Sequence, residues 1–166
     1  AGTIVTKEIL TPDVPYRHTD LLPICQAVVM PVGLFVQNEA PWKTLKELVD
    51  DAKKNPGKLR ASVAGAGGFM DVLINLFKAE AGVDITVIPT KGGLAQSSAL
   101  MGGHSELCAD TVANNVDFLR AGRLRAIIST HKVAGFPMIK TFEEEGYPRV
   151  SLKLWHGFFG PKGLSK

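Results

Sequence analysis

The sequence predicts an α/β fold, a mostly parallel β-sheet with flanking helices. Apolar strands and amphipathic helices alternate from Lys58 to Ser129, an order that favours a parallel sheet covered by helices. Glycines follow the predicted helices, at the position where helices commonly end. The 166 residues are 45% hydrophobic and 21% charged, which is typical of one globular domain with its own core.

The segment before Lys58 contains a lead-in, two strands and a helix. Residues 1–20 form a lead-in segment that is extended or partly helical. Two apolar, β-branched runs at 21–29 and 33–37 predict strands. The first helix begins at Thr44-Leu45-Lys46-Glu47, a capping box in which the hydroxyl and the carboxylate each accept from a backbone amide. It ends at Asn55-Pro56-Gly57.

The alternating segments have clear boundaries. The expected strands are residues 59–63, 85–88, 107–109 and 124–129, and the expected helices are residues 70–81, 94–101 and 112–121. The buried face of helix 70–81 is expected to carry Val72, Leu73, Leu76 and Phe77. Right-handed crossovers place the strand-to-helix turns on one edge of the sheet, which is the edge where ligands bind in open α/β sheets.

The alternation fades after Ser129. Residues 140–146 predict a short acidic helix with a solvated glutamate face. Residues 152–160 predict a final extended segment that is rich in aromatic residues.

Composition and residue spacing exclude several classes of function. The net charge of +3 comes from scattered basic residues, so nucleic acid is not an expected partner. No stretch approaches the roughly 18 apolar residues of a membrane span, and the first residues do not resemble a signal peptide. Cys25 and Cys108 have no metal-binding spacing and the histidines are isolated, so neither a metal nor a cofactor is expected. Both thiols are expected to be buried and inert, and a disulfide between them is left open.

A glycine-rich turn, Gly65-Ala66-Gly67-Gly68, joins strand 59–63 to helix 70–81. Glycine permits positive φ and lets a ligand approach the backbone without meeting a Cβ. The first amides of the following helix lack intrahelical partners and carry the positive end of the helix dipole. The turn therefore predicts a site for a carboxylate or phosphate. The alternative is a tight turn that only packs.

Nucleotide motifs do not fit this turn. Gly65-Ala66-Gly67 begins a G-x-G-x-x-G pattern, but the sixth position is Met70 and no ribose-binding acid follows the next strand. No Gly-Lys-Ser/Thr follows for a P-loop, and Ser62 is not flanked as in a nucleophile elbow.

Two further strand-to-helix turns are expected at the same edge. Thr90-Lys91-Gly92 offers a hydroxyl, free amides and an ammonium group. Asp110 is either a helix cap or an acceptor for a ligand's ammonium or hydroxyl group. Convergence of the three turns on one crevice favours ligand binding. No nucleophile, base and orienting group lie at an interpretable spacing, so no catalytic residue is assigned.

An ordered series of motifs resembles a known family. The motifs are Trp42-Lys43-Thr44-Leu45-Lys46-Glu47-Leu48, Lys54-Asn55-Pro56-Gly57-Lys58-Leu59, Gly82-Val83-Asp84-Ile85, Pro89-Thr90-Lys91-Gly92-Gly93, Gly102-Gly103-His104-Ser105-Glu106-Leu107 and Ala121-Gly122-Arg123-Leu124-Arg125-Ala126. In this order, within a stretch from Asp20 to Pro161, they resemble the Bug-type (TctC) periplasmic receptors of the tripartite tricarboxylate transporter family.

The resemblance implies one lobe of a two-lobed type II periplasmic-binding-protein (Venus flytrap) fold. Residues 21–160 would form the ligand-binding lobe, with hinge strands near 21–30 and 152–160, and residues 161–166 a truncated return to a missing lobe. The ligand would be a small organic acid: a di- or tricarboxylate, an amino acid or an aromatic acid. The ligand-contacting residues would be Ser62, Gly65, Ala66, Gly67, Gly68, Thr90, Lys91, Gly92 and Asp110. The implied partners are the transporter's membrane subunits, and the implied location is the periplasm.

Other functions remain open at this point. An effector-sensing domain of a transcriptional regulator and an enzyme on the same scaffold would share this architecture. Exposed aromatic residues at Trp155, Phe158 and Phe159 would favour a homodimer. The alternative for these aromatics is an ordinary hinge-strand core.

Overall fold

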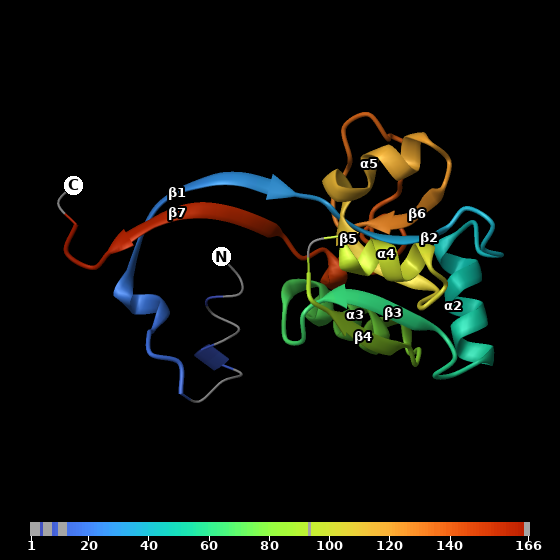
Figure 1. The fold of residues 1–166 in the computed structure, drawn as a ribbon, viewed down its shortest axis with the longest axis horizontal. Helices are drawn as coiled ribbons and strands as arrows, with labels where there is room; N and C mark the ends of the chain where they lie inside the picture. Colours follow the sequence, from blue (N-terminus) through green and yellow to red (C-terminus); the bar gives the residue numbers. More distant parts are fainter. Residues whose placement is uncertain (1–3, 5–7, 10–12, 93, 165–166) are drawn as a thin grey trace.

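The computed structural model describes residues 4, 8–9, 13–92 and 94–164. Within the predicted lead-in segment, residues 1–3, 5–7 and 10–12 lie outside the described residues, as do residue 93 of the second turn and residues 165–166 of the predicted return. Figure 1 shows an α/β body from which a long, curved ribbon of two strands projects.

The body is built on one mixed sheet. In the described part of the chain its strands are β2 (Val32–Gln37), β3 (Arg60–Ala64), β4 (Thr86–Thr90), β5 (Leu107–Thr111) and β6 (Leu124–Ser129), in the spatial order β4-β3-β5-β2-β6. β3 pairs in parallel with β4 and β5, whereas β2 runs antiparallel to β5 and β6. The predicted α/β fold is confirmed, and β2 is the strand that makes the sheet mixed.

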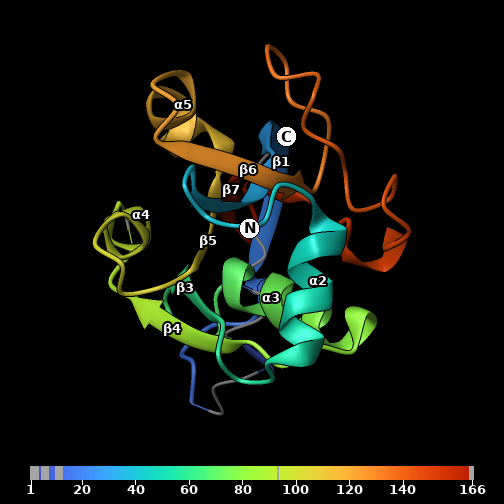
Figure 2. The same ribbon diagram turned by 90° about the vertical axis from the view of Figure 1, so that its right-hand side faces the viewer.

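Helices cover both faces of this sheet. They are α2 (Leu45–Lys54), α3 (Phe69–Ala81), α4 (Ala95–Met101) and α5 (Val112–Arg120). Two short 3-10 helices are also described, η1 (His18–Asp20) just before the ribbon and η2 (Pro148–Val150) just before its second strand. Figure 2 shows α2 and α3 on one face and α4 and α5 on the other. The predicted capping box begins α2, where Glu47 N–H donates to Thr44 Oγ1 (3.2 Å) and Thr44 N–H to Glu47 Oε2 (3.1 Å). No described helix is long and apolar enough to cross a membrane.

Strand side chains alternate between the two faces, and the core therefore divides into two clusters. In β2, Leu34 and Val36 belong to the cluster that includes the buried residues of α2 and α3. Phe35, between them in sequence, packs with Leu100 of α4 and Val112 of α5 in the second cluster. Both faces of β2 are therefore buried from Val32 to Val36.

The buried stripe of α3 is rotated from the predicted one. Its buried residues are Met70, Leu73, Ile74, Phe77 and Ala81, a regular helical spacing, and Val72 is exposed instead. Phe77 anchors the stripe, because its ring lies 5.6 Å from that of Phe142 and 5.8 Å from that of Tyr147. Residues from beyond β6 thus decide which face of α3 is buried.

A separate two-stranded sheet forms the ribbon. β1 (Leu21–Met30) pairs antiparallel with β7 (Leu154–Pro161), from Leu21 opposite Pro161 to Met30 opposite Leu154. The predicted strands in these two segments are confirmed. Phe158 is 64% exposed on the ribbon, whereas the rings of Trp155 and Phe159 lie 6.0 Å apart.

The predicted acidic helix at 140–146 is wrong. The segment forms turns, in which Thr141 N–H donates to Glu144 Oε2 (2.9 Å) and Glu144 N–H to Thr141 Oγ1 (3.3 Å). Thr141 also bridges to Ser129 of β6, and Gly146 has a φ of 87°. The bridge ties the start of the segment to β6, and the left-handed glycine stops a helix from continuing.

The two cysteines lie in different surroundings and are both free thiols. Cys108 is buried, and this burial raises its pKa to about 12, as expected of an inert thiol. Cys25 is exposed on the ribbon, so its predicted burial is wrong. The disulfide that the sequence left open is not formed.

Phe77→Ala should lower the free energy of unfolding by about 3–5 kcal/mol, because it leaves a cavity between α3 and the two rings that contact it. The matched control is Phe158→Ala, which removes an exposed ring and should change stability by less than about 1 kcal/mol. Urea unfolding of both variants measures this. Equal losses of stability would contradict the described core.

Acid should selectively weaken the link between β3 and the segment before β5. Hydrogen bonds from Arg60 hold the pKa of the Glu106 carboxyl below its usual range, with Nη2 2.6 Å from Oε1. This stabilisation is present above the ordinary glutamate pKa and is lost as pH falls through the lowered one. Glu106→Gln should therefore reduce stability at pH 6 more than at pH 3, as measured by urea unfolding. Exposed Glu143→Gln is the control, and the same deficit for Glu106→Gln at both pH values would rule out this ion pair.

Candidate functional site

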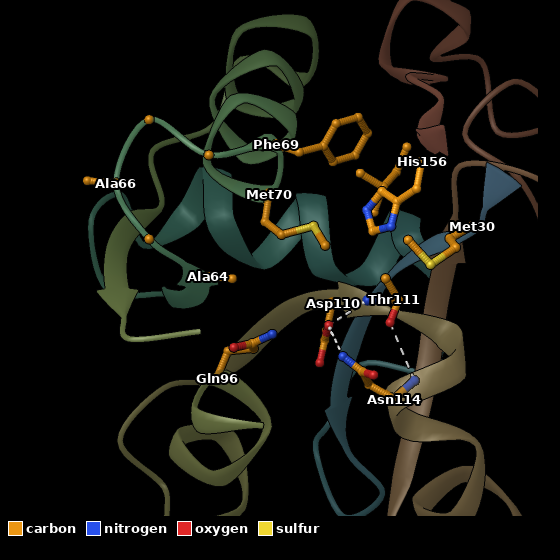
Figure 3. Close-up of a pocket in the computed structure, with 14 residues that line it drawn as sticks. Met30, Ala64, Ala66, Phe69, Met70, Gln96, Asp110, Thr111, Asn114 and His156 are labelled. Carbon is orange, nitrogen blue, oxygen red and sulfur yellow. Dashed lines mark hydrogen bonds between the residues drawn. The ribbon is translucent and has the colours of Figure 1, made fainter. Parts of the chain in front are cut away.

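A cavity of about 550 Å³ opens at the carboxyl ends of β3 and β5, beside the base of the β1–β7 ribbon (Figure 3). We call it the glycine-turn cavity. Its lining residues, drawn from β1, β3, β5, β7 and the helices that follow the strands, are Met30, Ala64, Gly65, Ala66, Gly67, Gly68, Phe69, Met70, Gln96, Asp110, Thr111, Asn114, Leu154 and His156. This is the edge at which the sequence predicts ligand binding.

The glycine turn forms one wall of the cavity, and its backbone requires glycine at two positions. Gly65 and Gly67 have φ values of 74° and 68°, where a side chain costs about 1–2 kcal/mol. Gly68 is the N-cap of α3 and brings no side chain to the helix end. A Cβ on Gly68 would lie 2.8 Å from the Ala64 carbonyl oxygen. The turn is therefore shaped to bring bare backbone to the cavity.

Two of the turn's amides are satisfied within the protein. Gly65 N–H donates to the Thr90 carbonyl (3.0 Å), and Gly67 N–H donates to Asp71 Oδ2 (2.7 Å). In the described part of the chain, the amides of Ala66 and Gly68 donate no hydrogen bond. The first amides of α3 also lack intrahelical partners. The groups of the turn that remain able to bind an anion are therefore the amides of Ala66 and Gly68, together with the first amides of α3.

Asp110 lies in the opposite wall and is 1% exposed. Its Oδ1 accepts from Thr111 N–H (2.7 Å) and Asn114 Nδ2 (3.0 Å), and its Oδ2 accepts from Asn115 Nδ2 (3.2 Å). Ser97 Oγ also lies 3.2 Å from Oδ2, but its single hydrogen is shared with Asn115 Oδ1 at 2.8 Å. The N-cap of α5 is Thr111, whose Oγ1 accepts from Asn114 N–H (3.4 Å), so the cap considered for Asp110 belongs to the next residue. A ligand contact of Asp110 stays a prediction.

Ser62 does not line the cavity, contrary to its predicted role. It is fully buried in β3, and its Oγ lies within hydrogen-bonding distance of the carbonyls of Gln96 (2.9 Å) and Leu107 (3.2 Å). Ser105 Oγ donates to it at 3.0 Å. Its side chain points into the layer between the sheet and α4, because strand residues alternate in direction. Ser62 therefore ties α4 to β3.

The second predicted turn also lies outside the cavity lining. Thr90 Oγ1 donates to the Val63 carbonyl (3.0 Å), and Lys91 is exposed. Gly92 has a φ of 84° but does not contact the cavity. β4 is the edge strand beyond β3, so its end is displaced from the crevice between β3 and β5. Its contribution is indirect, since the Thr90 carbonyl holds the Gly65 amide.

Residues that sequence reasoning missed complete the cavity. Phe69 and Met70 come from the first turn of α3, and Met30, Leu154 and His156 come from the ribbon. Figure 3 shows Phe69, Met70, His156 and Met30 around a common space above Asp110 and Thr111. The ribbon residues carry no motif, and their position depends on the pairing of β1 with β7, which the sequence does not specify.

The electrostatics of the cavity are unusual for an anion site. Among its described lining residues none is lysine or arginine, and the ionisable side chains are those of Asp110 and His156. An anion would therefore depend on backbone amides and the dipole of α3, not on an ion pair.

Solved structures share this fold. One is described as a periplasmic transporter and is 27% identical to this chain, with a TM-score of 0.89. The match covers 98% of this chain and 55% of the transporter protein. MatC from Rhodopseudomonas palustris, solved with malate, is 27% identical, with a TM-score of 0.84, and the match covers 98% of this chain and 56% of MatC. An R. palustris protein solved with adipate is 25% identical, with a TM-score of 0.87, and the match covers 98% of this chain and 55% of that protein. The chain thus shares its fold with about half of each of these proteins.

Sequence relatives specify the family. The family model of the tripartite tricarboxylate transporter family receptors matches residues 1–166 of this chain. BugT of Bordetella pertussis is 29% identical over 93% of this chain and 48% of its own length. A protein from Pseudomonas sp. strain P51, encoded between tcbD and tcbE, is 29% identical over 98% and 50%. The chain belongs to the tripartite tricarboxylate transporter receptor family, and it spans about half the length of these relatives.

Asp110→Asn should destabilise the protein by about 2–3 kcal/mol, because an amide NH2 would face donors that the carboxylate now accepts from. Exposed Asp117→Asn on α5 is the matched control and should be nearly neutral. Thermal and urea unfolding measure both. A fully stable Asp110→Asn variant that fails only in ligand binding would instead show that Asp110 contacts the ligand.

Proposed function

We propose that this chain is the ligand-binding lobe of a periplasmic receptor that captures a small organic acid for a tripartite tricarboxylate-type transporter. The observation that carries the proposal is the glycine-turn cavity, which is lined by Ala66, Gly68 and the start of α3, and the amides of Ala66 and Gly68 donate no hydrogen bond in the described part of the chain. Such a helix start favours a carboxylate. Relatives solved with malate and with adipate support the same class of ligand.

The receptor role is favoured over a regulatory sensor domain by the family match, which is to a transporter receptor. The matching family is one of receptors, and the Asp110 carboxylate is buried and accepts from Thr111 N–H, Asn114 Nδ2 and Asn115 Nδ2. We therefore assign no catalytic step to this chain. The membrane subunits of the transporter are its proposed partners.

We assign the β1–β7 ribbon as the hinge of the receptor and residues 21–160 as its lobe. Antiparallel pairing from Leu21 opposite Pro161 to Met30 opposite Leu154 makes the ribbon a continuous connection to the body. Residues 161–166 are the proposed start of the return to a second lobe. A homodimer through Phe158 on the ribbon stays a prediction, which size-exclusion chromatography of Phe158→Ser tests.

Carboxylates should raise the melting temperature of the chain in a thermal-shift screen and bind with measurable heat in calorimetry. The screen contains di- and tricarboxylates, amino acids and aromatic acids. A ligand that binds only the folded state stabilises it in proportion to its concentration over Kd. If no acid in the screen stabilises the protein, the proposed function is wrong.

Gly65→Ala should weaken the binding of the best acid at least several-fold, because Cβ at a φ of 74° forces the turn and its amides to rearrange. Gly82→Ala is the matched control. It places the same strain (φ 63°) at the other end of α3, with open space around the new Cβ in both variants. Both should lose about 1 kcal/mol or more of stability, but only Gly65→Ala should lose affinity in calorimetry.

A further inference from the structure

The pairing register of the ribbon directs one of its faces at the cavity. Met30 pairs with Leu154, and Val28 pairs with His156. Paired residues share a face, and residues two apart along a strand share it too. These four side chains therefore lie on one face of the ribbon, and three of them line the glycine-turn cavity.

The base of this face is fixed to the body. Leu154 is half-buried and packs against the core cluster that also holds Phe69 and Met70. His156 is two residues further along β7, which is roughly 6–7 Å along an extended strand. Its position at the cavity is thus set by a packed neighbour and not by a free loop.

His156 presents an unused hydrogen-bonding group to the cavity. The residue is exposed, and among the described residues its imidazole makes no hydrogen bond or ion pair. Figure 3 shows it across the cavity from Ala66, with Met70 and Phe69 between them. In the polar wall, Asp110 and Gln96 are each 1% exposed, and Asn114, which is exposed, donates from Nδ2 to Asp110 Oδ1 (3.0 Å).

The cavity therefore has two polar ends and an apolar middle. Backbone amides of the glycine turn form one end, and His156 forms the other. The side chains of Phe69 and Met70 lie between them, and Met30 and Leu154 add further apolar lining. A ligand that fits all three parts is an extended acid with a carboxylate at one end, an apolar body and a second acceptor at the far end.

We propose that His156 is a specificity-determining residue that donates a hydrogen bond to the distal acceptor of an extended organic acid, whose proximal carboxylate binds the glycine turn. This inference rests on the proposed function, and it adds the shape of the ligand and the residue that reads its far end. A site that hydrogen-bonds a ligand group discriminates strongly against an analogue that lacks the group.

The test compares two acids of equal chain length in calorimetry with the full chain. Adipate carries a distal carboxylate, and hexanoate ends in a methyl group. The wild-type protein should bind adipate about tenfold tighter or more, the value of one hydrogen bond to a charged acceptor. Succinate, which has two methylene groups fewer than adipate, should bind more weakly than adipate if the two ends of the cavity are read by an extended acid.

Variants of His156 separate a specific contact from a general one. His156→Ala should remove the preference for adipate and leave hexanoate affinity unchanged. His156→Gln, which keeps an N–H donor, should retain part of the preference. Exposed His104→Ala, outside the cavity lining, is the control and should bind both acids as the wild type does.

The outcomes distinguish this inference from the proposed function. If an acid of another shape binds and neither adipate nor hexanoate does, or if the preference for adipate survives in His156→Ala, the role of His156 is wrong and the receptor function stands. If no acid of any class binds, both fail. Equal loss of both acids in His156→Ala would show a packing effect and would also overturn the proposal.

Discussion

The antiparallel insertion of β2 between β5 and β6 is the constraint on which the rest of the structure depends. Val32, the first residue of β2, pairs with Thr111, the last residue of β5. The chain arriving from the ribbon is thus delivered to the carboxyl edge of the sheet. Hydrogen bonds lock this entry, since Val112 N–H donates to the Pro31 carbonyl (2.9 Å) and Thr130 N–H to the Val32 carbonyl (2.8 Å). A parallel β2 would bring the ribbon to the opposite edge, away from the glycine turn.

This entry point explains how one cavity is assembled from distant segments. The glycine turn follows β3, Asp110 lies next to the last residue of β5, and His156 arrives on β7, which pairs with β1 just before β2 begins. The amides supply positive potential without a cationic side chain. The buried Asp110 carboxylate accepts from Thr111 N–H, Asn114 Nδ2 and Asn115 Nδ2 and so holds the Asn114 side chain in place.

Sequence reasoning succeeded where a local interaction decides the structure. The capping box at Thr44 and Glu47 fixed the start of α2, and glycine at Gly82 marked the end of α3. Where contacts between distant segments decide the structure, sequence reasoning was incomplete. Val72 was expected inside, but Phe142 and Tyr147 pack on Phe77 and set which face of α3 is buried. A helix was expected at 140–146, but the bridge from Thr141 to Ser129 holds that segment against β6.

By itself the sequence determined the order of strands and helices up to β6, the family resemblance and the glycine turn, because local periodicity, capping and positive-φ glycines are properties of short segments. Only the tertiary structure decided which predicted site residues meet. Gly65 to Gly68 and Asp110 line one cavity, whereas Ser62 lies inside the sheet layer and Thr90, Lys91 and Gly92 lie beyond it. It also brought Met30, Leu154 and His156 to that cavity. The physical reason is that strand order and pairing register are set by long-range packing, which no segment of the sequence encodes alone.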